Sequence, residues 1–130
     1  MTDDAPDLAP FFERYAGAFA DYDAGAIAAC YLTPCLFVRD GHTVALDSGG
    51  AVVESVEALL ALHRAWDVQT VAPAEVALLE QGPGHAVARV DWRLGWAASR
   101  MAWTFATTYT LVPADDDWRV AVAVTHDAPF

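Results

Sequence analysis

Two consecutive stretches, HAVARVDWRLGW at residues 85–96 and MAWTFATTYTLV at residues 101–112, decide the fold because their side chains alternate. Bulky apolar residues recur at every second position, and small, hydroxyl-bearing or charged residues lie between them. Successive side chains of a strand point to opposite faces of a sheet. We therefore predict two long strands with one aromatic face turned toward the interior, on which lie Trp92, Trp96, Trp103, Phe105 and Tyr109.

Weaker alternation on either side predicts two more strands, at 69–80 and 118–126. Glycine, proline and clustered aspartates mark the connections between these four strands. The expected turns lie at Gly82-Pro83-Gly84, near Ser99 and at Asp115-Asp116-Asp117. The C-terminal half of the chain is therefore expected to form an antiparallel run of strands.

The N-terminal half has helical spacing instead. Apolar residues in 8–22 recur on one helical face, which includes Tyr15 and Phe19. A later helix, following Gly50, places His63 and Trp66 on its apolar side. These two helices are expected to cover the sheet.

A short helix and a hairpin are expected between them. Asp23 is a typical N-cap for a helix over 24–32, and Thr33-Pro34 is expected to end it because the residue before proline avoids helical geometry. Asp40-Gly41 is a typical turn between short strands at 35–38 and 42–46.

Helices followed by a run of antiparallel strands predict an α+β fold, with three N-terminal helices packed on one face of a mainly antiparallel sheet. A chain of 130 residues is the usual size of one domain. We expect a single domain over 8–130, preceded by an acidic tail at 1–7.

Charge and composition exclude several classes of partner. The formal net charge is -11, and all seven cationic residues are arginine. Nucleic acids and anionic membranes would repel such a chain, so we expect neither as a partner. The N-terminal sequence has no basic and apolar signal pattern, and Cys30 and Cys35 have no common zinc or redox spacing. A cytoplasmic protein with reduced thiols is expected.

The motifs of most cofactor-dependent chemistries are missing. The sequence has no dinucleotide-binding glycine loop, no phosphate loop, no H-E-x-x-H and no G-x-S-x-G. Its histidines, at positions 42, 63, 85 and 126, form no pair with metal-ligand spacing. We expect neither a metal nor another cofactor.

The order of the elements resembles that of the nuclear-transport-factor-2-like superfamily over about residues 8–127. Within it, the ketosteroid isomerases are locally the most similar. Their first two helices resemble Arg14-Tyr15, seven residues, Asp23, two residues, Ala26-Ile27, three residues and Tyr31. The resemblance implies a cone-shaped fold, in which a strongly curved sheet and the helices enclose one apolar pocket.

The resemblance also implies roles for individual residues. In those isomerases a carboxylate moves a proton between carbons, while a tyrosine and a protonated aspartic acid donate hydrogen bonds to the enolate. Tyr15 falls at the tyrosine position and Tyr109 near the second acid. The carboxylate position falls on Arg39, and the nearest acid is Asp40, one residue along. His126 matches a C-terminal aromatic residue of the pocket.

The residues themselves leave alternatives open. Tyr15 is either a catalytic phenol or a core tyrosine, and Asp40 is either a proton acceptor or simply a turn residue. Arg39 points inward to an anionic group or outward to solvent. His63 either faces the pocket or packs at the helix C-terminus. His126 follows Val120, Val122 and Val124 at strand spacing, on a face expected to look into the cavity, where histidine suits proton transfer.

Two functions remain in competition. The first is a pocket that binds a small apolar molecule, with cofactor-free isomerase, dehydratase or cyclase chemistry by Tyr15 with Asp40 or His126. Its expected wall consists of Phe19, Arg39, His63, Trp92, Trp103, Phe105 and Tyr109. The second is a non-catalytic association module whose rings fill the cavity. In either case the Thr/Ala face of 101–112 is expected to form a homodimer.

Overall fold

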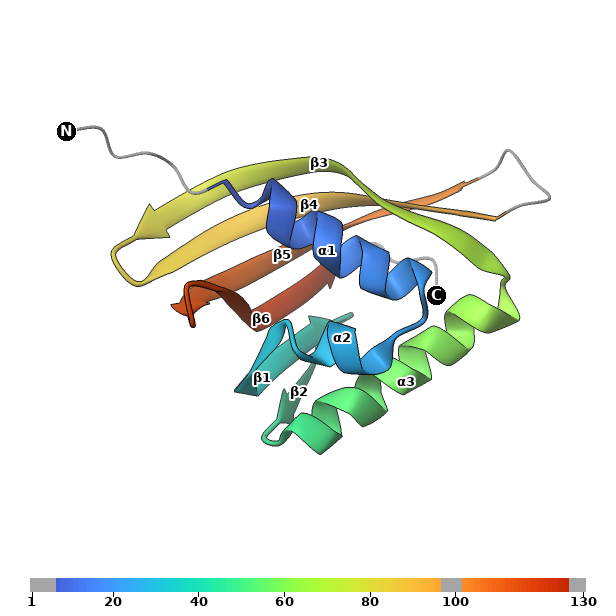
Figure 1. Ribbon diagram of the computed structural model, residues 1–130, viewed down its shortest axis with the longest axis horizontal. Helices are drawn as coiled ribbons and strands as arrows, with labels where there is room; N and C mark the ends of the chain where they lie inside the picture. The colour runs from blue at the N-terminus through green and yellow to red at the C-terminus, as the bar shows by residue number, and fades with distance from the viewer. Residues whose placement is uncertain (1–6, 97–101, 127–130) are drawn as a thin grey trace.

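The computed structural model describes residues 7–96 and 102–126, which form three helices and one six-stranded sheet (Figure 1). The elements, in chain order, are α1 (Ala9–Ala20), α2 (Ala24–Ala28), β1 (Tyr31–Arg39), β2 (His42–Leu46), α3 (Gly49–Ala65), β3 (Val68–Gly82), β4 (His85–Trp96), β5 (Ala102–Ala114) and β6 (Asp117–His126).

The sheet has the strand order β2-β1-β6-β5-β4-β3. All neighbouring strands pair antiparallel except β1 and β6, which are parallel. The long strands β3, β4 and β5 curve over α1, while α2 and α3 lie toward the β1–β2 end (Figure 1). Three helices on a curved mixed sheet confirm the predicted α+β class.

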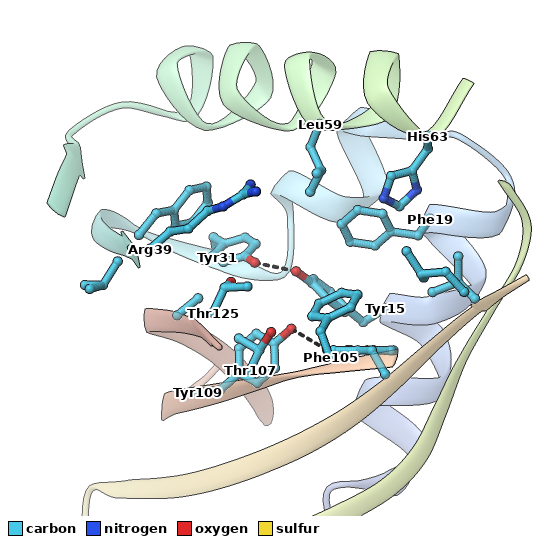
Figure 2. A pocket seen from close by; sticks show the side chains of 16 residues that line it. Tyr15, Phe19, Tyr31, Arg39, Leu59, His63, Phe105, Thr107, Tyr109 and Thr125 are labelled. Carbon is cyan, nitrogen blue, oxygen red and sulfur yellow. Dashed lines mark hydrogen bonds between the residues drawn. The ribbon is translucent and has the colours of Figure 1, made fainter. Parts of the chain in front are cut away.

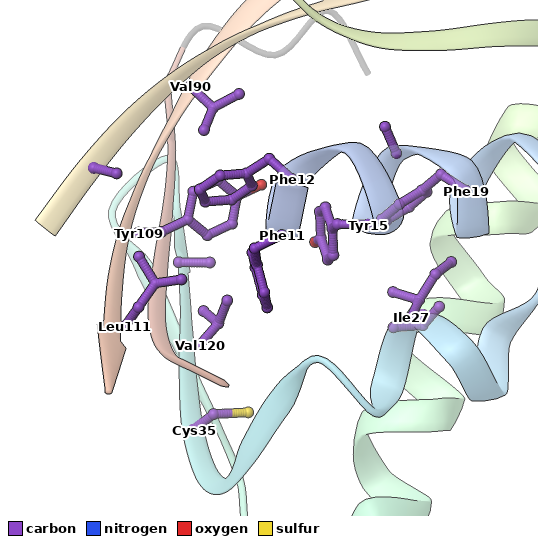
Figure 3. Packing of buried hydrophobic residues seen from close by; sticks show 14 of the residues in the cluster. Phe11, Phe12, Tyr15, Phe19, Ile27, Cys35, Val90, Tyr109, Leu111 and Val120 are labelled. Carbon is purple, nitrogen blue, oxygen red and sulfur yellow. The ribbon is translucent and has the colours of Figure 1, made fainter. Parts of the chain in front are cut away.

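The apolar stripe of α1 forms the centre of the core. Phe12 is completely buried, and its ring centroid lies 5.0 Å from that of Tyr109 on β5 (Figure 3). Burying a phenylalanine side chain stabilises a fold by about 1.5–3 kcal/mol. α1 ends at Ala20, two residues before the last predicted stripe residue, Tyr22, whose backbone turns with a φ of 54°.

The short second helix begins as predicted but ends earlier. The Asp23 carboxylate accepts a hydrogen bond from the Ala26 backbone nitrogen at 3.0 Å, as an N-cap should. The helix ends at Ala28 instead of residue 32, and Pro34 lies inside β1. The register between β1 and β6 shifts between Tyr31 and Leu36. Pro34, which has no backbone N–H to donate, lies in this irregular segment and so breaks no regular ladder of hydrogen bonds.

The four long strands agree with the prediction to within a few residues, and β4 has the predicted bounds. The predicted turn near Ser99 and the first six residues of the predicted acidic tail lie outside the described residues. One further correction concerns Trp66, which was expected on the buried side of the third helix. It is the C-cap of α3, and 55% of its surface is exposed.

A bulge in β6 changes which residues face the helices. Thr110 pairs with Val122, but the next residue of β5 pairs with Val120, which leaves Ala121 as an extra residue. An extra residue reverses the alternation beyond it. Val120 is fully buried in the core, whereas Val124 lies on the opposite face of the sheet. The expected common face of Val120, Val122, Val124 and His126 is therefore wrong.

Candidate functional site

A cavity of about 160 Å³ lies between α3 and the sheet, with α1 along its side (Figure 2). Every element except α2 and β2 contributes to its wall. The lining residues are Tyr15, Phe19, Tyr31, Phe37, Val38, Arg39, Leu59, His63, Val71, Trp92, Leu94, Phe105, Thr107, Tyr109, Ala123 and Thr125. The site is thus an aromatic and aliphatic chamber with a few polar groups.

Three tyrosines bring hydroxyl groups together at the wall. Tyr15 comes from the buried stripe of α1, Tyr31 from the start of β1 and Tyr109 from β5. The hydroxyls of Tyr15 and Tyr31 are hydrogen-bonded to each other (Figure 2). The Trp92 indole nitrogen donates to the Tyr109 oxygen at 3.1 Å. The ring centroids of Tyr15 and Tyr109 are 5.9 Å apart, so the phenols form one cluster.

These phenols remain protonated at neutral pH. Burial is the main reason that the pKa of Tyr15 lies well above its usual value, and Tyr109 and Tyr31 raise it further. Burial also raises the pKa of Tyr31 well above its usual value and that of Tyr109 to about 12. A neutral phenol can donate a hydrogen bond, so the cluster can polarise an oxygen atom of a ligand.

His63 faces the cavity from the last turn of α3, beside Phe19 (Figure 2). Only 3% of the surface of His63 is exposed, and its ring centroid lies 5.6 Å from that of Phe19. Burial lowers the pKa of His63 to about 4, because the charged imidazolium is poorly solvated there. The ring is therefore neutral at physiological pH.

Arg39 lies at the solvent edge of the cavity. Its side chain is 37% exposed, and Nε lies 3.6 Å from Oδ2 of Asp40, whose side chain is 77% exposed. Asp40 itself occupies the β1–β2 turn, with a φ of 51°, and does not line the cavity. Arg39 is the one permanently charged side chain of the wall, since no Asp or Glu of the described part of the chain lines it.

The structure brings together seven of the ten residues predicted for the site: Tyr15, Phe19, Arg39, His63, Trp92, Phe105 and Tyr109. It leaves out Asp40, Trp103 and His126. Trp103 packs its ring instead against Trp66 and Trp96, with centroid separations of 5.0 and 5.3 Å. Nε2 of His126 is 2.9 Å from Oγ1 of Thr108, on the sheet face away from the cavity.

Sequence reasoning missed several wall residues. The sequence predicted Tyr31 to lie in the second helix, although Tyr31 is the last residue of the pattern that resembles the first two helices of the ketosteroid isomerases. Thr107 alternates with Phe105 and Tyr109, so its inward direction was readable from strand periodicity. The inward direction of Thr125 could not be predicted from the sequence, because it depends on the extra residue in β6.

The described residues hold neither a metal-binding cluster nor a membrane helix. Within residues 7–96 and 102–126, no group of three or more histidine, cysteine or acidic residues is arranged to hold a metal ion. None of the helices in this part of the chain has the length and apolar character needed to cross a membrane.

Comparison with protein families gives one match over nearly the whole chain. The model described as "NTF2-like protein (DUF6841)" matches residues 6–128. A search of curated proteins finds no match.

Solved structures share the fold at low sequence identity. A variant of Rv3472 from Mycobacterium tuberculosis, described as a protein of unknown function, is 18% identical with a TM-score of 0.71, covering 92% of this chain and 68% of its own. Aln2 from a Streptomyces species is 17% identical with a TM-score of 0.73, over 95% and 94%. A putative calcium/calmodulin-dependent protein kinase II association domain from Xanthomonas campestris is 13% identical with a TM-score of 0.70, over 99% and 92%.

Proposed function

The chain belongs to the NTF2-like protein family DUF6841, and we propose that it binds a small, largely apolar molecule in the cavity between its helices and sheet. The observation that carries the proposal is the cavity of about 160 Å³, which persists among many large rings. The competing idea of a self-filled interior depended on Trp92, Trp103 and Phe105. Trp103 packs outside the cavity wall, and Trp92 is held against Tyr109, so neither fills the space.

The volume limits the size of the ligand. An engineered apolar cavity of about 150 Å³ in another protein binds benzene, whereas pockets for drug-sized ligands measure about 300–1,000 Å³. A molecule of roughly one ring matches the cavity described above. The four fused rings of a steroid exceed this volume, so a steroid would have to extend beyond the mouth of the cavity.

The polar groups favour binding over proton transfer. The expected proton acceptors, Asp40 and His126, do not line the cavity. His63 does, but a base with a pKa of about 4 is poorly matched to proton transfer near neutral pH. Isomerase, dehydratase or cyclase chemistry by Tyr15 with either expected acceptor therefore draws little support, and ligand binding is the function proposed.

A pair of leucines on α3 gives a matched test. Leu59 lines the cavity, while Leu62, nearly one turn along, is 41% exposed. Leu59→Phe adds ring volume inside the chamber, and Leu62→Phe adds the same atoms outside. With phenol as the probe, calorimetric titration is expected to show binding to the parent chain and to Leu62→Phe, and at least about tenfold weaker binding to Leu59→Phe. Equal binding by both variants, or none by the parent chain, would refute the proposal.

A second candidate function is association through the outer face of the sheet. Thr104, Ala106 and Thr108 alternate with the cavity residues of β5 and so face away from the helices. The bulge adds Val122 and Val124 to this face. One fold relative is described as an association domain, which supports the same idea. We propose a homodimer through this face, and sedimentation showing only monomer at micromolar concentration would rule it out.

A further inference from the structure

We propose that the cavity's ligand is a small monocarboxylate, with its carboxylate held by Arg39 and Thr125 and its apolar body inside the aromatic chamber. The inference deepens the proposed binding function and depends on it. It rests on how three neighbouring strands align their polar side chains, and on the charge of the wall.

Sheet pairing places a cation beside two hydroxyl groups. Arg39 of β1 and Thr125 of β6 are register partners, and Thr125 is also the partner of Thr107 on β5. All three residues line the cavity. Adjacent strands lie about 4.8 Å apart, so these side chains form a continuous polar row across the chamber. Figure 2 shows Arg39 extending over the cavity above Tyr31, with Thr125 and Thr107 below.

The chemistry of this row favours a carboxylate. A guanidinium presents parallel N–H donors that match the two oxygens of a carboxylate, and a threonine hydroxyl can donate a further hydrogen bond. No acidic side chain of the described residues lines the cavity to oppose an anion. Most of the other wall groups, such as Phe37, Leu59 and Phe105, are apolar and suit a hydrocarbon body.

A single negative charge fits better than a higher one. Among the described residues the wall offers one permanent cation, and the chain as a whole carries a formal charge of -11. Transferring an ion into an apolar chamber is costly unless a partner compensates it. One guanidinium can compensate one carboxylate, whereas a phosphate dianion would retain an uncompensated charge.

The ion pair with Asp40 does not block this role. The Nε to Oδ2 separation is 3.6 Å, and the two side chains are 37% and 77% exposed. Exposed pairs of this kind contribute little to stability, because water screens both charges. A ligand carboxylate that is partly shielded from water and bonded to two side chains can outcompete such a contact.

Three probes of similar size test the inference: benzoate, neutral benzamide and the benzylammonium cation. Calorimetric titration at pH 7 and low salt is expected to give benzoate at least about tenfold tighter binding than benzamide, since hydrogen bonds to a charged group are stronger than those to a neutral one. Benzylammonium is expected to bind more weakly than benzamide. Equal binding of benzoate and benzamide would overturn the carboxylate inference while leaving the binding function intact. No binding by any probe would overturn both.

Variants assign the preference to the proposed residues. Arg39→Met keeps an apolar stem and is expected to remove the benzoate preference without weakening benzamide binding. Arg39→Lys keeps the positive charge but not the paired N–H donors of the guanidinium, and it is expected to retain part of the benzoate preference. Thr125→Val removes the hydroxyl and is expected to reduce the preference. Arg93→Met, on the exposed outer side of β4, changes the net charge equally and is the control. If Arg93→Met and Arg39→Met reduce the preference equally, the site assignment is wrong.

Discussion

The indole nitrogen of Trp92 donates a hydrogen bond of 3.1 Å to the phenolic oxygen of Tyr109, and this bond joins β4 to β5 at the wall of the cavity. The two residues are 4% and 3% exposed. A buried N–H donor without an acceptor loses its interaction with water and gains nothing in return. The bond therefore fixes the indole ring against the core and leaves the chamber beside it open.

Tyr109→Phe is expected to destabilise the fold by about 1–3 kcal/mol, because it removes the acceptor and leaves the Trp92 donor buried without it. Urea denaturation followed by tryptophan fluorescence measures the difference. Thr104→Val, on the exposed outer side of β5, is the control and is expected to change stability by less than about 0.5 kcal/mol. A Tyr109→Phe chain as stable as the parent would mean that the hydrogen bond contributes nothing.

His63 makes stability depend on pH. Its folded pKa, about 4, lies below the ordinary 6.5, so the unfolded chain binds more protons between these values. The contribution of neutral His63 is fully present above pH 6.5 and is lost as the pH falls toward 4. The loss amounts to about 3 kcal/mol, at 1.36 kcal/mol for each unit of pKa.

The matching measurement is the free energy of unfolding of the parent chain and of His63→Leu at a series of pH values from 7 to 4. Carboxylates also titrate in this range, but they do so in both proteins. The difference between the two curves is therefore expected to shrink, or to reverse in favour of His63→Leu, as the pH falls. A difference that stays constant would show that His63 is not held neutral by the fold.

Asp40→Asn is expected to strengthen benzoate binding by roughly twofold to fivefold, the range that corresponds to one exposed ion pair. The substitution removes the acid that competes for Arg39. Asparagine tolerates the positive φ of 51° at this position, so the turn should survive. Asp47→Asn, at another exposed acid, changes the net charge equally and is expected to have a smaller effect. Unchanged or weaker binding by Asp40→Asn would contradict the role given to Arg39.

The general fold could be predicted from the sequence because it follows from the local periodicity of apolar residues. The alternation around Trp92 and Phe105 predicted both the strands and their inward faces, and the helical stripe containing Tyr15 predicted the core of α1. The same periodicity placed several residues of the cavity wall, among them Trp92, Phe105 and Tyr109. Local rules were sufficient wherever each strand kept a regular period of two.

The errors occurred where pairing between distant segments overrides local preference. Pro34 suggested the end of a helix, but the chain had already entered β1, and an irregularity against β6 accommodates the proline. The extra residue Ala121 is visible only in the register of β6 against β5. That single residue moved His126 away from the cavity and placed Thr125 in it. No composition or spacing along β6 signals the change.

The bulge itself is tested by two adjacent substitutions. If alternation ran regularly from buried Val120, Val124 would face the core and Ala123 would face outward. The observed register reverses this: Ala123 is 7% exposed and lines the cavity, and Val124 lies on the outer face. Ala123→Arg is therefore expected to destabilise the fold by several kcal/mol, because it buries a charge without a partner acid.

Val124→Arg, by contrast, is expected to fold normally, to bind benzoate like the parent chain and to weaken the proposed homodimer by placing a cation on the shared face. Thermal unfolding measures the first difference and sedimentation the second. If Val124→Arg proved the more destabilising of the two, the register of β6 would be wrong, and Thr125 would have to be removed from the proposed carboxylate site. If both variants folded but Val124→Arg remained dimeric, the outer face would not be the dimer interface.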